Sequence, residues 1–183
     1  MLNNKVLETE KFDHIHDELH ILLVEDSETD AYAVKRFLEA YMSRPHTVVC
    51  VQTLEQAEKS LSSKDNHFDI VLLDLGLPDS TGNFETYSRI SVYKEQLPII
   101  VLTSVDDDDL AIKMLGLGAQ DYVKKGSVHR DPSNLCRNIH FSIERHRSTS
   151  KSKKEMSLLI SEQTDLLQLV TGSYSVIHDN YHS

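Results

Sequence analysis

The sequence has few of the features that would crosslink a chain covalently or hold it in a membrane. It contains only two cysteines, Cys50 and Cys136, far apart along the chain, and we expect both to be reduced thiols in the core. No apolar stretch approaches the roughly 20 residues of a membrane-spanning helix, and the first 19 residues lack the apolar core of a signal peptide. These absences predict a cytoplasmic protein.

Positive charge is also scarce. The 19 Lys and Arg residues face 29 Asp and Glu residues, so the net charge is −10. Such a charge argues against a general affinity for DNA or for anionic membranes. The 183 residues suffice for one domain with a sizeable core plus an appendage. The hydrophobic share of 39% indicates that part of the chain lies outside that core.

From residue 19 onward the chain alternates between apolar runs and amphipathic segments. The predicted strands are residues 20–25, 47–51, 68–75, 99–103 and 121–124, and the predicted helices are residues 29–42, 54–61, 83–94, 106–115 and about 132–147. Five such β–α units with short connections predict an α/β fold: a doubly wound parallel sheet with helices on both faces. Ligands of such sheets bind outside the carboxyl ends of the strands.

Polar residues close four of the five predicted strands. The set comprises Glu25 and Asp26 after the first strand, Asp74 at the end of the third, Thr103 at the end of the fourth, and Lys125 just after the fifth. Because parallel strands end at one edge of the sheet, we expect these side chains to converge. Carboxylate oxygens are ligands that Mg²⁺ prefers, and a carboxylate such as Asp74 can form an acyl-phosphate. The set therefore suits a divalent cation and a phosphoryl group.

The chain resembles the receiver domain of bacterial two-component response regulators, the CheY-like family, over residues 19–147. The matching segments are LLVEDSETDA (22–31), DIVLLDLGLPDSTG (69–82), PIIVLTSVDD (98–107) and GAQDYVKKG (118–126). The resemblance implies a five-stranded sheet in the flavodoxin-like order 2-1-3-4-5. It also implies a phosphoprotein that receives its phosphoryl group from a sensor histidine kinase or a histidine phosphotransfer protein.

The same resemblance implies roles for the residues at the strand ends. Asp74 is the implied phosphoacceptor. Mg²⁺, the one cofactor implied, would bind Asp26, Asp74 and the backbone carbonyl of Gly76, and Glu25 would contact the ion through a water molecule. These residues form the metal side of the implied site.

On the other side of the implied site, Thr103 and Lys125 hold the phosphoryl group. Tyr122 matches an aromatic switch residue, which turns inward as Thr103 moves toward the phosphate. Two residues beyond Asp74 and Thr103 the chain has Gly76 and Val105, and neither carries a side chain that could orient an attacking water. We therefore expect a phosphoacceptor rather than an enzyme, with at most slow self-dephosphorylation.

The composition changes outside the receiver segment. We predict an N-terminal leader (1–18), the receiver domain (19–147), a basic linker (148–154), an amphipathic helix (155–171) and an irregular tail (172–183). Apolar positions of the helix recur three and four residues apart over about two heptads, which is too short to be stable alone. We expect this helix to contact a second copy or a downstream protein partner, although packing on its own domain stays open. The expected output is protein–protein contact, with no DNA-binding or catalytic output domain.

Three alternatives stay open. A haloacid-dehalogenase-like phosphohydrolase also uses an Asp nucleophile and Mg²⁺, but it needs a second Asp where this chain has Gly76. A phosphorelay intermediate would pass the phosphoryl group on to another histidine. A flavodoxin-like FMN carrier would need a phosphate-binding loop after the first strand, where residues 25–30 are instead mostly acidic.

Overall fold

The structure, a computed structural model, describes residues 18–104 and 107–179, with side chains as far as residue 167. Its elements, in chain order, are β1 (Leu19–Val24), α2 (Glu28–Tyr41), β2 (His46–Val51), α3 (Leu54–Ser62), β3 (Ile70–Asp74), α4 (Asn83–Ile90), η2 (Ser91–Tyr93), β4 (Ile99–Thr103), α5 (Asp108–Gly116), β5 (Asp121–Lys124), α6 (Lys125–Arg130) and α7 (Pro132–Asp179). The predicted leader up to residue 17, Val105 and residues 180–183 lie outside this description. Within it, no helix combines the length and hydrophobicity needed to cross a bilayer.

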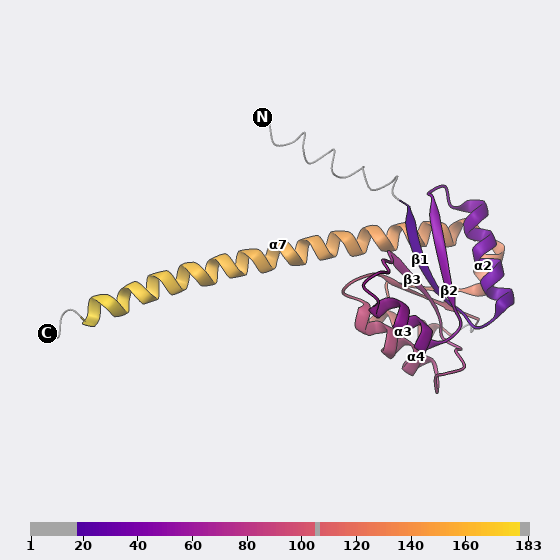
Figure 1. Cartoon of the computed structure of the whole chain (residues 1–183), viewed down its shortest axis with the longest axis horizontal. Coiled ribbons are helices and arrows are strands. Elements are labelled where there is room, and N and C mark those ends of the chain that lie inside the picture. Colours follow the sequence, from indigo (N-terminus) through magenta and orange to yellow (C-terminus); the bar gives the residue numbers. More distant parts are fainter. Residues whose placement is uncertain (1–17, 105–106, 180–183) are drawn as a thin grey trace, which may run out of the picture. The chain divides into compact units, whose positions relative to one another are not determined.

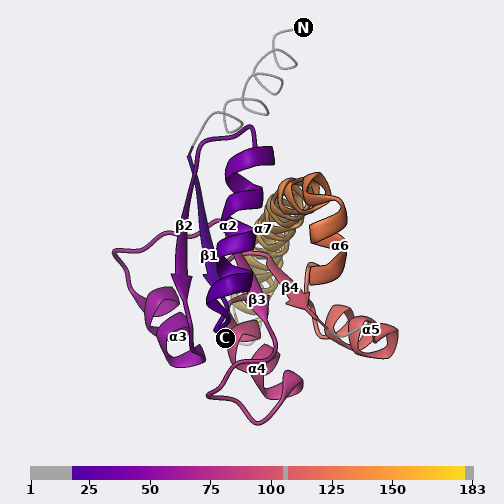
Figure 2. The ribbon, with the colours of Figure 1, turned by 90° about the vertical axis from the view of Figure 1, so that its right-hand side faces the viewer.

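The five strands form one parallel sheet in the order β2-β1-β3-β4-β5. Figure 2 shows β2 at one edge of this sheet, beside β1. The predicted fold class and strand order are confirmed. Strand β3 lies in the middle and is buried at every position, as expected for the longest continuous apolar run in a sheet covered on both faces.

Two apolar clusters cover the two faces of the sheet. Successive side chains of a strand point to opposite faces, so Ile21 and Leu23 of β1 join one cluster and Leu22 and Val24 join the other. The first cluster includes residues of α2 and of the first turns of α7. The second includes residues of α3, α4 and α5, and α3 and α4 contact each other (Figure 1). Both layers hold the carboxyl ends of the strands at one edge.

Helix α7 is longer than the sequence predicts. It continues from Pro132 to Asp179 without a break (Figure 1). The predicted basic linker over 148–154 lies within this helix, and so do residues 172–179 of the predicted irregular tail. Residues 148–154 contain no Pro or Gly, Lys has good helix propensity, and Ser can bond to the preceding turn within a helix. The change in composition therefore does not end the helix.

The chain divides into two compact units, Met1–His146 and Arg147–Ser183. The sheet and its covering helices belong to the first unit, and the described part of the second is the continuation of α7. The sequence also does not predict α6, a helix of six residues that begins at Lys125 immediately after β5. The position of α6 fixes the backbone at the lysine expected on the phosphoryl side.

Candidate functional site

Side chains from four strand ends meet at the carboxyl edge of the sheet, as expected from the sequence. Paired positions such as Val24 with Leu73, Asp74 with Leu102 and Thr103 with Lys124 keep the strand ends in step. A cleft of about 250 Å³ opens there. Its lining comprises Glu25, Asp26, Ser27, Asp30, Asp74, Leu75, Gly76, Asn83, Thr103, Ser104 and Lys125. All the residues predicted for the metal and phosphoryl sides are among them.

Three carboxylates form a compact acidic group in this cleft. One oxygen each from Glu25, Asp26 and Asp74 lies within 4.8 Å of the others. Glu25 and Asp74 are buried, whereas Asp26 is exposed. The backbone N–H of Gly76 donates to Asp74 Oδ2 at 2.9 Å and so orients that carboxylate. Oxygen ligands from two buried and one exposed carboxylate fit a hard divalent cation that keeps several of its waters.

Lys125 balances part of this negative charge. Its Nζ lies 2.6 Å from Glu25 Oε2, 2.9 Å from Asp30 Oδ2 and 3.0 Å from Asp74 Oδ1. Burial alone would lower the pKa of Lys125, but the three carboxylates raise it above its ordinary value. Lys125 therefore stays a cation while it is almost fully buried.

Glu25 is the most deeply buried acid of the group, with 1% of its surface exposed. Burial raises its pKa above the ordinary value, and the nearby Asp74 charge adds to this, whereas the Lys125 ammonium opposes it. Glu25 Oε2 accepts no well-aligned hydrogen bond within the described chain, so its contact with Lys125 is an ion pair. A cation in this cleft would lower the free energy of the ionised Glu25 further.

Asp30 belongs to the site, although it ends no strand and is therefore not predicted from the sequence. It is the third residue of α2, whose first turn is capped by the Ser27 hydroxyl accepting from the Asp30 N–H. In this position an acid usually reaches back to the backbone N–H of the capping residue. Here Ser27 N–H donates to Glu25 Oε1 instead, and the Asp30 carboxylate accepts from Lys125. The only sequence signal was an acid on the turn that follows the Glu25-Asp26 pair.

Thr103 and Tyr122 occupy different surroundings. Thr103 is buried and lines the cleft. Tyr122 does not line it; its ring is half-buried against the apolar cluster of α3, α4 and α5. The buried Tyr122 hydroxyl has no hydrogen-bond partner among the described residues. The structure thus brings Thr103 to Asp74 and Lys125, and the switch role of Tyr122 stays a prediction.

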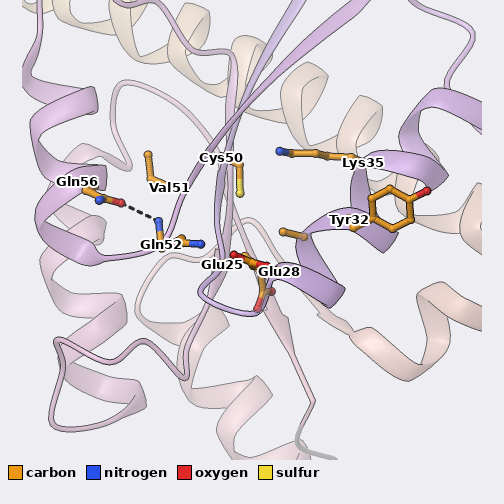
Figure 3. Close-up of a pocket in the computed structure, with 9 residues that line it drawn as sticks. Glu25, Glu28, Tyr32, Lys35, Cys50, Val51, Gln52 and Gln56 are labelled. Atoms are coloured by element: carbon orange, nitrogen blue, oxygen red, sulfur yellow. Dashed lines mark hydrogen bonds between the residues drawn. The ribbon is translucent and has the colours of Figure 1, made fainter.

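A larger cleft of about 470 Å³ lies on the other side of Glu25. Figure 3 shows Lys35 of α2 extending toward Cys50 of β2 across it, whereas the ring of Tyr32 points away, and the Gln52 N–H donates to Gln56 Oε1 at 2.9 Å. Asp74, Thr103 and Lys125 do not line this cleft. Its greater volume therefore does not make it the place for phosphoryl chemistry, which needs the acceptor and the ammonium together.

Comparisons with known proteins agree with this geometry. Residues 21–139 match the family described as the response regulator receiver domain. The chain belongs to this family. The receiver is 32% identical over 135 residues to the transcriptional regulatory protein BasR of Escherichia coli K12, covering 74% of this chain and 57% of BasR. It is 29% identical to the cell cycle response regulator CtrA of Brucella ovis, covering 73% of this chain and 54% of CtrA. The chain thus spans little more than half the length of these relatives.

Solved receiver structures show the same fold. The BeF₃-activated N-terminal receiver domain of Klebsiella pneumoniae RstA is 26% identical, with a TM-score of 0.56, and the match covers 68% of this chain and 97% of that one. The Mn²⁺-bound form of the response regulator Rcp1 is 24% identical, with a TM-score of 0.55, and covers 66% of this chain and 91% of its own. The receiver family is a phosphoacceptor signalling module, and its homologues here are regulators.

Proposed function

We propose that this receiver accepts a phosphoryl group on Asp74 from the phosphohistidine of a sensor histidine kinase or a histidine phosphotransfer protein, with Mg²⁺ as cofactor. One observation carries the proposal: Asp74 belongs to an acidic group suited to a cation, and its Oδ1 also lies 3.0 Å from the ammonium of Lys125. Both described cysteines are unpaired, which agrees with a reducing cytoplasmic location.

The chain's own residues divide the work of the transfer. A carboxylate oxygen of Asp74, oriented by the Gly76 N–H, forms the new O–P bond as the P–N bond breaks and the electron pair returns to the imidazole. Lys125 and Thr103 border the cleft where the transferred oxygens must lie, so they can stabilise the charge there. Mg²⁺ held by Asp26, Asp74 and the backbone carbonyl of Gly76, with Glu25 acting through a water molecule, would neutralise the acidic group and the phosphoryl oxygens.

The experiment that tests this proposal is phosphorylation by a small phosphodonor. The full chain is incubated with acetyl phosphate and Mg²⁺, and the phosphorylated form is separated on a phosphate-affinity gel. We expect a shifted band that disappears with EDTA and with Asp74→Asn. The control is Asp65→Asn, since Asp65 is an exposed acid outside the cleft and its loss should leave the band unchanged. A band that persists in Asp74→Asn would overturn the assignment of the acceptor.

The same samples separate a phosphoacceptor from a phosphohydrolase. Gly76 offers no side chain that could act as a general acid or orient a water, so we expect a band that decays over minutes or longer after the donor is removed. Continuous turnover of acetyl phosphate far beyond one equivalent would favour the haloacid-dehalogenase-like alternative. Onward transfer to a histidine would favour a phosphorelay intermediate.

For the output we propose protein–protein contact through the second unit, with a second copy of the chain as the partner. Met156, Leu159, Ile160 and Leu166 are each more than half exposed. Met156, Leu159, Gln163 and Leu166 follow the a and d spacing of a coiled coil. In a parallel pair of identical helices this spacing places the apolar side chains of one copy against those of the other, and Gln163 against Gln163. A paired polar residue at such a position fixes the register of the two helices.

A further inference from the structure

Carboxylate oxygens crowd the ammonium of Lys125 on three sides. A lysine has three N–H donors, and three carboxylate oxygens, from Glu25, Asp30 and Asp74, lie between 2.6 and 3.0 Å from Nζ. A phosphoryl oxygen that approaches Lys125 must therefore replace one of these oxygens or share its position.

The three carboxylates differ in what their release would require. The Glu25 side chain is fully buried, so without Lys125 it would be left as an unpaired charge in the interior, which is strongly unfavourable. Asp74 is the acceptor itself. The Asp30 side chain is 32% exposed and lies in the first turn of a surface helix, where water and the helix dipole both stabilise a free carboxylate. Asp30 is accordingly the partner that Lys125 can leave at least cost.

We propose that Asp30 competes with the phosphoryl group for Lys125 and so weakens retention of that group on the receiver. This inference rests on the proposed function and adds to it a residue that restrains the site. In the unphosphorylated chain the Asp30 carboxylate accepts one N–H of Lys125. When the phosphoryl group is present, Lys125 bonds to a phosphoryl oxygen and Asp30 is released to water. The negative charge of Asp30, which remains near the cleft, also repels the anionic group.

Asp30 could instead serve only to stabilise the start of α2, and Glu28 separates the two roles. Glu28 lies in the same first turn and carries the same charge, so it interacts similarly with the helix dipole. It lines the larger cleft and not the one that contains Asp74 and Lys125. Glu28→Gln and Asp30→Asn therefore remove equal charge from one turn, but only the second change should affect Lys125.

The experiment measures the affinity for beryllofluoride, a phosphoryl analogue, by ¹⁹F NMR with the full chain and saturating Mg²⁺. For Asp30→Asn we expect binding about three- to tenfold tighter than in the wild type, because a partly buried ion pair no longer competes. Asp30→Ser, which also removes the charge and suits a first turn, should behave alike. Glu28→Gln should change the affinity by less than about twofold, and Asp30→Glu should restore much of the competition.

The outcomes distinguish this inference from the function on which it rests. A wild type that binds no beryllofluoride would refute the proposed function and the inference with it. A wild type that binds, with both uncharged variants equal to it or weaker, would refute the role of Asp30 alone. Equal tightening in Glu28→Gln would also refute it, because the effect would then be general electrostatics. The Mg²⁺ affinity of each variant, titrated without beryllofluoride, shows that the change is not in the metal site.

Discussion

The two units of the chain depart from ordinary burial in opposite ways. The first unit buries charge: Glu25, Asp74 and Lys125 are each less than one tenth exposed. The second unit exposes apolar side chains: in its described part Leu158, Leu159, Leu166 and similar residues are more than half exposed. Charged groups are rarely buried unless they are paired, and clustered exposed apolar groups usually mark a contact surface.

The two units differ in what offsets the cost of the buried charges and of the exposed apolar side chains. In the site this compensation is internal, because Lys125 pairs with the buried acids and their spacing suits a cation. In the second unit no described residue buries the apolar side chains that face outward, so their compensation must come from elsewhere. The first region thus suits a small charged group, and we propose that the second receives a surface of a partner.

Removing the internal compensation should have the largest effect. Lys125→Met keeps the length of the side chain but leaves Glu25 and Asp74 without their buried cation. We expect the free energy of unfolding in EDTA to fall by about 3 kcal/mol, in the range found when one partner of a buried pair is removed. Mg²⁺ should recover part of the loss, because an ion that binds only the folded state stabilises it. Urea unfolding with and without Mg²⁺ measures both effects.

Lys124 provides the matched control for this change. It is the preceding residue, but its side chain is 39% exposed and pairs with the exposed Asp108 at 3.2 Å. Lys124→Met should cost no more than about 1 kcal/mol and should show no added dependence on Mg²⁺. If the two lysine variants lose equal free energy of unfolding, the burial of the Lys125 charge does not contribute to stability.

Some residues of the site could be predicted from the sequence, and others could not. Strand ends such as Asp74 and Thr103 were predictable because parallel strands end at one edge, whatever the packing behind them. Asp30 was not, since Ser27-x-x-Asp30 resembles an ordinary capping arrangement and only three-dimensional contact shows that Glu25 takes that N–H. The continuity of α7 could not be predicted from composition, because a polar and basic segment can be either a linker or an exposed stretch of helix.

Adding charge to the exposed apolar surface should have the next largest effect. Leu159→Lys places an ammonium on the predicted seam between two copies, and we expect the dissociation constant of the dimer to rise at least about tenfold. Leu158→Lys is the control: it adds the same charge to the neighbouring residue, which is similarly exposed but about 100° away around the helix. Sedimentation equilibrium measures the dissociation constants. A wild type that stays monomeric at high concentration would exclude the second copy as the partner of α7.

The smallest expected effect concerns His140, a partly buried histidine on the part of α7 that packs in the first unit. Its imidazolium form would be a buried charge that the neighbouring residues offset only in part. Burial lowers its pKa below the ordinary value, the positive charge of Arg44 lowers it further, and Glu144 opposes the shift. The folded state therefore disfavours the charged imidazole. As the pH falls through the ordinary histidine value, the unfolded chain takes up a proton that the folded chain declines, so stability decreases.

His140→Gln removes this contribution. Between about pH 7.5 and about pH 5.5 the wild type should lose up to about 1 kcal/mol more stability than the variant does, and the difference should vanish at the upper end of that range. Urea unfolding at several pH values measures these slopes. A steeper loss in His140→Gln would mean that the folded chain stabilises the imidazolium, and that Glu144 compensates His140 as fully as the acids compensate Lys125.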